Sequence, residues 1–245
     1  MRVTIDFETY RGVPGSSLSD FRCEQTVILH DFITSRAGMN YVQVQKEAAD
    51  LHLFKSRSVL RTFCPLLANL HFVEYGNDEN FRFTDDGILF VNAIKAIESC
   101  ESIDSKTEND KKVLNNLYEI KKDLIRLGIS NMYNDLELRN NNIWIAFSLL
   151  KNLDYLIWNE YFWGLHLIKE KLFSVEEACS SISKNRVEDI VYEAFNKNGE
   201  KIADTQWSYM RSLLYEADLI EDYKLGSRLN ANGIKFLKDI NYGEQ

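Results

Sequence analysis

Two acidic residues near the N-terminus have the types and spacing that metal-dependent chemistry requires. Asp6 and Glu8 lie in the segment 1–10, where apolar and polar residues alternate and predict a short strand. Two carboxylates on one strand can hold divalent metal ions, and a pair of such ions can assist the displacement of a phosphoryl group. The sequence therefore offers one candidate for nuclease chemistry at its N-terminus.

The four residues Asp6-Phe7-Glu8-Thr9 resemble the first metal-binding motif of DEDD-type 3′–5′ exonucleases. The later acidic motifs of that class have no recognisable counterpart in this chain. That fold also requires a long mixed sheet, whereas this chain is predicted to be mostly helical. We therefore favour an edge strand with exposed acids. The nuclease stays as an alternative that Mg²⁺-dependent degradation of DNA would reveal.

Other catalytic patterns do not occur in the sequence. There is no phosphate-binding glycine loop, metalloprotease helix, nucleophile elbow or paired Cys/His ligand set. The histidines are isolated in apolar helical settings, and the cysteines lack C-x-x-C spacing and are expected to be buried: Cys23, Cys64, Cys100 and Cys179. We expect no enzyme, no catalytic residue, no cofactor and no metal.

Charge and composition limit the class of protein. The chain has 29 basic and 37 acidic side chains, a net charge of −8, 45% hydrophobic residues and two prolines. This composition favours a folded, mostly helical protein. Because non-specific DNA affinity comes from neutralised phosphates, a chain of this charge needs a local basic patch to bind DNA. No apolar run predicts a membrane span or a signal peptide, so we expect a cytoplasmic protein without membrane contact.

One stretch of the sequence occurs twice. Arg82–Ile94 and Arg228–Ile240 share Arg, Gly, Ile, Phe and a final Ile at one constant offset. The preceding segments also match, since Leu66–Tyr75 and Leu213–Asp222 each predict a helix end that runs into a short strand. A turn and a second strand follow, and a polar residue then caps the next helix. The pattern indicates an internal duplication.

Helix, strand, turn, strand, polar cap and closing helix resemble the second half of a winged-helix domain. The resemblance covers 18–98 and 175–241 and implies tandem winged helices. We therefore predict a mainly α fold with short β wings, in which two winged-helix domains are joined by a helical middle segment. The expected boundaries are an N-terminal strand or arm at 1–17, a first winged-helix domain at 18–100, a helical middle at 101–174 and a second winged-helix domain at 175–245.

The first copy carries a small basic cluster where a winged helix faces DNA. Lys55, Arg57, Ser58 and Arg61 lie at the start of its predicted third helix. Phosphate contact is one interpretation, and solvated surface side chains are the other. Pro65 lies in the same helix, which is therefore either kinked or begins late. The predicted wing is acidic, and this charge opposes contact with phosphate.

The second copy is a poorer candidate for DNA. Its predicted third helix, at about 204–215, contains Trp207 on its apolar side and Arg211 as its basic residue. Four acidic residues follow directly, at 216, 218, 221 and 222. Since local charge of this sign repels phosphate, we predict that this copy contacts protein.

The segment 143–173 is unusually rich in large apolar residues, and charged residues interrupt it. A helix that is apolar on nearly every side is buried, either in the core of this chain or against a partner. The core is the favoured interpretation, and a partner surface with aromatic anchors is the alternative. The predicted partner interface comprises Trp144, Tyr155, Trp158, Tyr161, Phe162, Trp163, Trp207 and Arg211.

A predicted helix in the middle segment carries one apolar stripe. It begins at a capping box, Ser105–Glu108, and closes at Gly128. Its apolar residues recur at alternating intervals of four and three: Val113, Leu117, Ile120, Leu124 and Leu127. About two heptads are too few for a coiled coil. We therefore expect the stripe to pack on another surface.

Two acidic winged helices with a helical middle resemble the kleisin-interacting tandem winged-helix proteins that accompany SMC ATPases. This resemblance implies a non-enzymatic accessory subunit of an SMC-like, DNA-handling complex, with anti-phage or anti-plasmid defence as one setting. The implied partners are an SMC-type ATPase or a kleisin-like subunit, with weak contact to duplex DNA, and a homodimer is compatible with it. The alternative is a stand-alone winged-helix DNA-binding regulator, or the target-recognition part of a restriction system.

Overall fold

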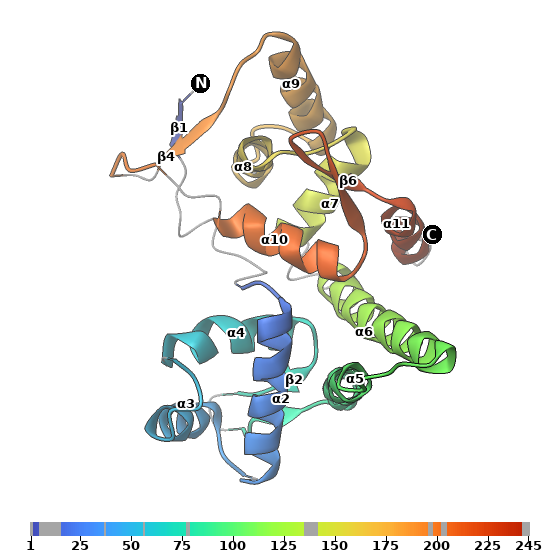
Figure 1. Cartoon of the computed structure of the whole chain (residues 1–245). Coiled ribbons are helices and arrows are strands. Elements are labelled where there is room, and N and C mark those ends of the chain that lie inside the picture. The colour runs from blue at the N-terminus through green and yellow to red at the C-terminus, as the bar shows by residue number, and fades with distance from the viewer. Residues whose placement is uncertain are drawn as a thin grey trace. The chain divides into compact units, whose positions relative to one another are not determined.

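The structure is a computed structural model that describes residues 2–4, 16–36, 38–55, 57–76, 79–134, 142–195, 198–201 and 205–241. The chain forms two compact units (Figure 1). Leu18–Met132 contains the first copy of the repeated stretch and is called the first-copy unit. Met1–Ser17 and Tyr133–Gln245 together contain the second copy and are called the second-copy unit.

The first-copy unit is helical apart from one short β-ribbon. Its elements are α2 (Asp20–Thr34), α3 (Tyr41–Asp50), α4 (Arg57–Asn69), β2 (Val73–Glu74), β3 (Arg82–Phe83), α5 (Asp85–Glu101) and α6 (Glu108–Asn134), whose last two residues belong to the other unit. β2 and β3 are antiparallel, with Val73 opposite Phe83. The segment before α3 extends this ribbon, because the Phe81 N–H donates to the Met39 carbonyl at 2.8 Å.

The second-copy unit repeats this arrangement with additions. Its elements are β1 (Arg2–Thr4), α7 (Asn142–Asn152), α8 (Trp158–Lys169), α9 (Val175–Val187), β4 (Glu193–Phe195), α10 (Thr205–Glu216), β5 (Ile220–Tyr223), β6 (Gly226–Leu229) and α11 (Ala231–Asn241). β5 and β6 are antiparallel, with Asp222 opposite Ser227. Leu156, just before α8, exchanges two backbone hydrogen bonds with Ser227, at 2.8 and 3.0 Å.

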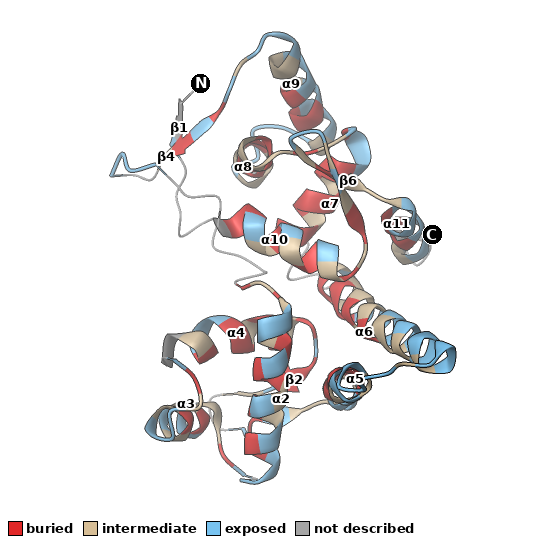
Figure 2. Ribbon diagram, in the orientation of Figure 1, coloured by how far each residue is buried: buried red, intermediate tan, exposed pale blue. Residues whose placement is uncertain are grey.

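These elements confirm a mainly helical protein with short antiparallel two-stranded sheets. Figure 2 shows buried residues concentrated on α4, α7 and α8, while much of α6 is exposed. In the first-copy unit the Phe72 and Phe90 rings stack at 4.5 Å between centroids. Among the described residues, no helix is long and apolar enough to cross a membrane.

The N-terminal strand is present but does not form a separate arm. β1 pairs in parallel with β4, with Val3 opposite Ala194, and this pairing makes the N-terminus part of the second-copy unit. Asp6 and Glu8, the candidate metal ligands, lie outside the described residues.

The two copies end their third helices in the same way. His71 after α4 and Asp218 after α10 have positive φ angles of 60° and 53°. The next amide closes each helix, because the Phe72 N–H donates to the Leu67 carbonyl at 2.8 Å and its equivalent, Leu219, makes the same bond at 2.9 Å. A residue in the left-handed region at this position reverses the chain and satisfies terminal carbonyls. In each copy the first strand begins two residues after this left-handed residue, at Val73 and at Ile220.

The closing helices also begin in the same way. The Thr84 hydroxyl accepts from the Gly87 N–H at 3.0 Å and donates to the His71 carbonyl at 2.6 Å. The Asn230 side chain accepts from the Gly233 N–H at 2.9 Å and donates to the Asp218 carbonyl at 3.1 Å. Each cap residue therefore holds the start of its helix and the end of the preceding one.

A close approach of backbone requires glycine in both closing helices. A Cβ atom at Gly87 would lie 1.9 Å from the carbonyl oxygen of Phe72, and one at Gly233 would lie 2.0 Å from that of Leu219. The carbonyls that these glycines face are equivalent in the two copies. The glycine shared by the two stretches is thus explained by packing of helix on backbone.

The predicted domain boundaries differ from the observed units. The expected middle segment, 101–174, is divided, since residues to 132 belong to the first-copy unit and the remainder to the second. The expected second domain, 175–245, is not a separate unit, because α7 and α8 belong to the same unit and Leu156 pairs with Ser227 of β6. α9 and β4 lie between α8 and α10.

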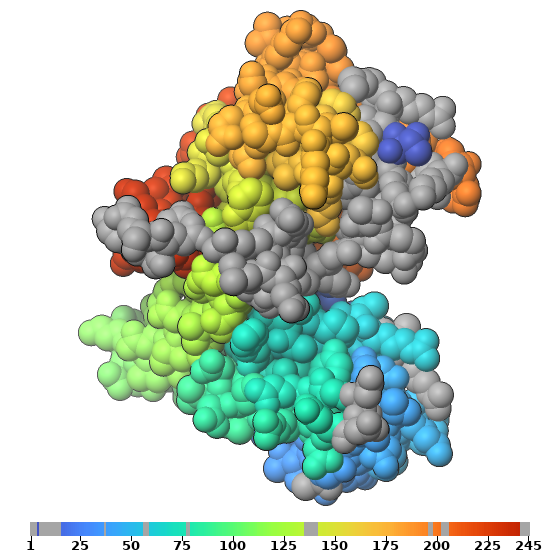
Figure 3. Space-filling view, turned by 180° about the vertical axis from the view of Figure 1, so that it is seen from behind, coloured from blue at the N-terminus to red at the C-terminus, as the bar shows by residue number. Residues whose placement is uncertain are grey.

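The long helix α6 differs from its prediction at both ends. Its cap is formed by Thr107 and Asp110, whose side chains bond each other's backbone N–H at 3.2 and 2.8 Å. It continues past Gly128, which packs on Leu70. Three residues of the predicted stripe are exposed, and Figure 3 shows α6 in light green at the surface. These are Val113 at 41%, Ile120 at 49% and Leu127 at 45% exposure.

Pro65 lies inside α4, which begins at Arg57. The alternative of a helix that begins at Pro65 is therefore excluded. Because proline has no N–H, the carbonyl of Arg61 loses its usual donor in the helix.

We expect Gly87→Ala to destabilise the first-copy unit and Gly233→Ala to destabilise the second-copy unit, each by about 1–3 kcal/mol, because the new methyl group must displace a backbone carbonyl. Urea unfolding followed by circular dichroism measures both effects. Leu89→Ala and Lys235→Ala are matched controls at exposed, equivalent positions of the same helices. A glycine variant as stable as its control would contradict the close approach.

Candidate functional site

Four of the aromatic residues predicted as partner anchors lie in the core of the second-copy unit. The exposed fractions are 0% for Tyr161, 1% for Phe162, 8% for Trp163 and 4% for Trp207. The Tyr161 ring packs against Trp207 at 4.9 Å between centroids, and Trp163 stacks on Tyr192 at 5.0 Å. A partner cannot reach rings that the unit itself covers. The partner-anchor prediction is therefore corrected for these four, which are core residues, although the small exposed part of Trp207 lines the hollow described next.

The remaining predicted interface residues are accessible to solvent. Trp144, Tyr155 and Trp158 are half-buried, and Arg211 is exposed. Trp158 and Arg211 line the same hollow. The structure thus brings together two of the four accessible residues.

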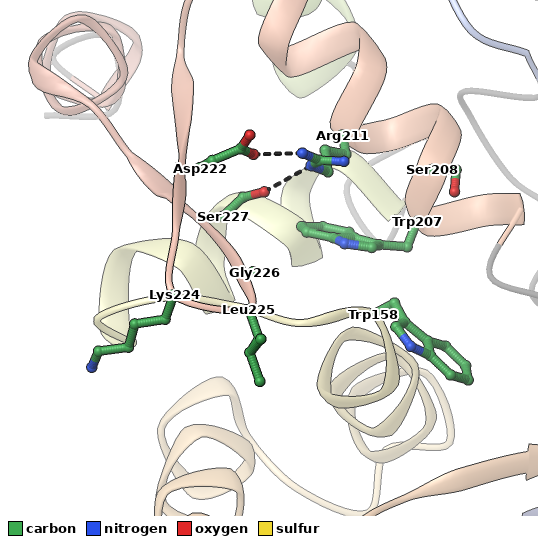
Figure 4. A pocket seen from close by; sticks show the side chains of 9 residues that line it. All are labelled: Trp158, Trp207, Ser208, Arg211, Asp222, Lys224, Leu225, Gly226 and Ser227. Carbon is green, nitrogen blue, oxygen red and sulfur yellow. Dashed lines mark hydrogen bonds and ion pairs between the residues drawn. The ribbon is translucent and has the colours of Figure 1, made fainter.

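That hollow, called the notch, lies between α10, the β5–β6 hairpin and the start of α8 (Figure 4). Its volume is about 350 Å³. Its lining residues are Trp158, Trp207, Ser208, Arg211, Asp222, Lys224, Leu225, Gly226 and Ser227. A second hollow of about 220 Å³ shares Ser208, Arg211 and Asp222 with it and continues along α10.

Arg211 connects α10 to both strands of the hairpin. Its Nη2 lies 2.5 Å from Asp222 Oδ1 on β5, and its Nε donates to Ser227 Oγ on β6 at 3.1 Å (Figure 4). The carboxylate neutralises the guanidinium. Since a guanidinium has five N–H donors, three remain for another group.

The turn of the hairpin is fixed by ionic and aromatic contacts. Lys224, with φ of 52°, places its Nζ 3.3 Å from Asp154 Oδ2. The same Nζ lies 4.6 Å from the ring centroid of Tyr155 and 4.9 Å from that of Tyr223. A cation over a ring face is attracted by the ring quadrupole. The next residue, Leu225, is 93% exposed and so stands at the tip of an anchored turn.

A buried ion pair supports the segment that anchors the turn. Arg186 on α9 places Nε 2.7 Å from Glu160 Oε1 and Nη2 2.7 Å from Glu160 Oε2. Its guanidinium lies 3.9 Å from the centroid of Tyr155 and donates to the Tyr155 carbonyl. The hydrogen bond to Glu160 holds the pKa of Arg186 above its usual value. Through Arg186, α9 thus holds Tyr155 and Glu160, which lie on either side of Trp158 in the sequence.

The same location is filled in the first-copy unit. Tyr41 and Trp158 are equivalent in the repeat, because Tyr41 starts α3 and Trp158 starts α8. At the positions of Arg211, Asp222 and Ser227, the first copy has Cys64, Tyr75 and Phe81. Polar residues in one copy therefore replace an apolar set in the other.

That apolar set forms a ring stack. The Tyr41 and Tyr75 rings lie 4.4 Å apart with planes 24° apart, and the Tyr75 and Phe81 rings lie 5.4 Å apart at 12°. Phe81 is 2% exposed and Cys64 is fully buried. Burial raises the pKa of Tyr41 to about 12 and raises the pKa of the Cys64 thiol. Of these two equivalent sites, only the one in the second copy is hollow.

No protein-family model, curated protein or solved structure matches this chain. The site is therefore interpreted from its own residues.

The predicted DNA-contact residues lie at the start of α4. Lys55 and Arg61 are exposed, and neither forms an ion pair with another described residue. The side chains of Arg57 and Ser58 lie outside the described residues. Glu79, in the turn of the first-copy hairpin, is exposed and acidic. Lys55 and Arg61 are therefore two exposed cations that a phosphate could contact.

Metal chemistry gains no support from the described part of the chain. Within it, no group of three or more His, Cys, Asp or Glu side chains is placed to hold a metal ion. Cys23, Cys64 and Cys179 are buried as expected, whereas Cys100 is half-buried.

Sequence reasoning missed six notch residues: Ser208, Asp222, Lys224, Leu225, Gly226 and Ser227. A signal for two of them was present, because aligning the copies shows Tyr75 replaced by Asp222 and Phe81 by Ser227. An aligned position that is apolar in one copy and polar in the other indicates that a space filled by side chains in one copy is a hollow in the other.

The raised pKa of Tyr41 gives a prediction for the filled site. Its folded-state pKa lies above its ordinary value, from 10.0 to about 12, so the stability that it contributes is present below pH 10 and is lost as the pH rises through 12. The difference in unfolding free energy between the wild type and Tyr41→Phe should therefore be smaller at about pH 11 than at about pH 9. Urea unfolding at both pH values measures it, and Tyr215→Phe controls for the loss of a hydroxyl. An unchanged difference would contradict the buried stack.

Proposed function

We propose that each unit is a winged helix. The order of three helices, a two-stranded hairpin and a closing helix occurs twice: in α2, α3, α4, β2, β3 and α5, and in α7, α8, α10, β5, β6 and α11. A strand segment between the first and second helices pairs with each hairpin, at Asn40–Asn80 and at Leu156–Ser227. In this proposal α4 and α10 are the third helices, and the hairpins are the wings.

The proposed function is that of a non-enzymatic accessory subunit of an SMC-like, DNA-handling complex in the cytoplasm, with anti-phage or anti-plasmid defence as its setting. The second-copy unit binds a partner protein, an SMC-type ATPase or a kleisin-like subunit, through the notch and the turn beside it. The architecture that the sequence resembles supports the class of complex, and the geometry of the notch supports the mode of binding.

The observation that carries this proposal is the neutralised charge of the helix–wing face of the second copy. Arg211 is paired with Asp222, Lys224 with Asp154 and Arg228 with Glu221. DNA binding draws its affinity from cations that phosphates can reach, and each of these cations already has a carboxylate. Protein interfaces instead favour an exposed apolar residue beside a pocket with aromatic and arginine walls. Leu225 and the notch have this form.

The alternative function, a stand-alone DNA-binding regulator or the target-recognition part of a restriction system, is favoured by one observation. Lys55 and Arg61 are exposed without a carboxylate partner among the described residues. These cations lie at the start of α4, the third helix of the first copy. They are compatible with weak DNA contact inside a larger complex, or with DNA binding by the protein alone.

Affinity purification of the tagged chain from its native host tests the proposal. We expect an SMC-type ATPase or a kleisin-like protein to co-purify, identified by mass spectrometry. Leu225→Asp should reduce its recovery by at least about tenfold, since a buried unpaired carboxylate costs more than 1.4 kcal/mol. Leu172→Asp is the control, because Leu172 is 57% exposed elsewhere on the same unit. Equal recovery with both variants, or no such partner, would contradict the proposal.

A further inference from the structure

The first copy shows which group fits a site of this shape. Tyr75 and Phe81 stack on Tyr41, and together these rings occupy the space between α3, α4 and the hairpin. The second copy keeps the same backbone frame, with equivalent caps, glycines and strand pairing. It has Trp158 where the first copy has Tyr41 and Trp207 where the first copy has Leu60, and it lacks the rings of Tyr75 and Phe81. The two ring positions on the hairpin of the first copy are therefore not filled by a ring from the hairpin of the second.

The residues that replaced those rings give the empty space its polarity. Ser227 stands where Phe81 places a ring, and Asp222 stands where Tyr75 does. Arg211 is held by both and has three N–H donors left. A group that enters the notch therefore meets the indoles of Trp158 and Trp207 on one side and the polar groups of Arg211 and Asp222 on the other (Figure 4).

We propose that the notch receives an aromatic side chain of the partner protein, and tyrosine in preference to phenylalanine. The ring packs against the indoles of Trp158 and Trp207, much as Tyr75 and Phe81 pack against Tyr41, and the phenol hydroxyl bonds to Arg211 or Asp222. This inference rests on the proposed protein-binding role of the second-copy unit and adds the chemistry of the residue bound. A ring with a polar end suits a pocket that is apolar at one wall and polar at the other.

A volume of about 350 Å³ is at the lower end of the range for ligand pockets, about 300–1,000 Å³. It accommodates one side chain and not a folded element. The exposed Leu225 at the rim then contacts residues adjacent to that side chain in the partner. The notch thus binds one residue of the partner, and Leu225 in the turn contacts the residues next to it.

The full chain with ¹⁵N-labelled tryptophan allows a direct test, because its four tryptophans give four indole N–H signals in an NMR spectrum. The probe is N-acetyl-tyrosinamide. We expect saturable shifts of the Trp158 and Trp207 signals, which come from the lining of the notch, with much smaller shifts of Trp144 and Trp163. Trp158→Phe, Trp144→Phe and Trp163→Phe assign three of the signals, and the fourth is that of Trp207. N-acetyl-leucinamide should bind at least about tenfold more weakly than the tyrosine probe, because it lacks a ring to stack.

A plugged variant is the matched control. Ser227→Phe restores the residue of the first copy and should abolish the probe-induced shifts, while the undisturbed Trp144 and Trp163 signals report a folded unit. Asp222→Tyr serves the same purpose if Ser227→Phe does not fold. The inference is overturned if the tyrosine probe gives no saturable shift, if the leucine probe binds equally well, or if the folded plugged variant still responds.

The two proposals fail in different ways. Loss of the partner in Leu225→Asp without any response to the tyrosine probe would leave the protein-binding role intact and refute the aromatic occupant. A specific response to the probe, together with full partner recovery in Leu225→Asp, would place the partner elsewhere and leave the aromatic site standing.

Discussion

The contact on which both units depend is the packing of a helix start on a backbone carbonyl. Gly87 and Gly233 bring the first turns of α5 and α11 against the carbonyls of Phe72 and Leu219, closer than any side chain allows. Because those carbonyls lie at the entry to the first strand, this contact sets the position of each hairpin relative to the helix before it. Thr84 and Asn230 hold the same junction through hydrogen bonds to the preceding helix end. The space between helix and hairpin follows from this frame.

Within one frame, the two copies use that space differently. The first copy fills it with stacked rings and the buried thiol of Cys64. The second copy has Arg211 in place of Cys64, and a cation there requires a carboxylate and a hydroxyl, which Asp222 and Ser227 supply. The result is a hollow whose charges are already paired. A paired, partly apolar hollow suits a protein ligand better than a phosphate backbone.

Much of this frame could be predicted from the sequence. The repeated stretch gave the caps at Thr84 and Asn230, the strands before them and the helices after them, because capping and turn residues act locally. The start of the second copy could not be predicted, since Ile157 and Trp158 carry no polar cap signal and α9 with β4 separates α8 from α10. For the aromatic-rich segment the core was the favoured interpretation, but a partner surface stayed open for Tyr161, Phe162, Trp163 and Trp207, because the residue types of a buried helix and of an interface are alike. The notch depends on residues far apart in the chain, and only a comparison of the two copies points to it.

The central proposal is that the second copy binds protein and that only the first copy contacts DNA, if either does. Its most direct test is the binding of the isolated chain to a fluorescent duplex, measured by anisotropy between about 50 and 200 mM salt. The account predicts weak, salt-sensitive binding that Arg61→Ala reduces further and Arg211→Ala leaves unchanged. Tight binding at the higher salt concentration that is lost in Arg211→Ala would contradict it.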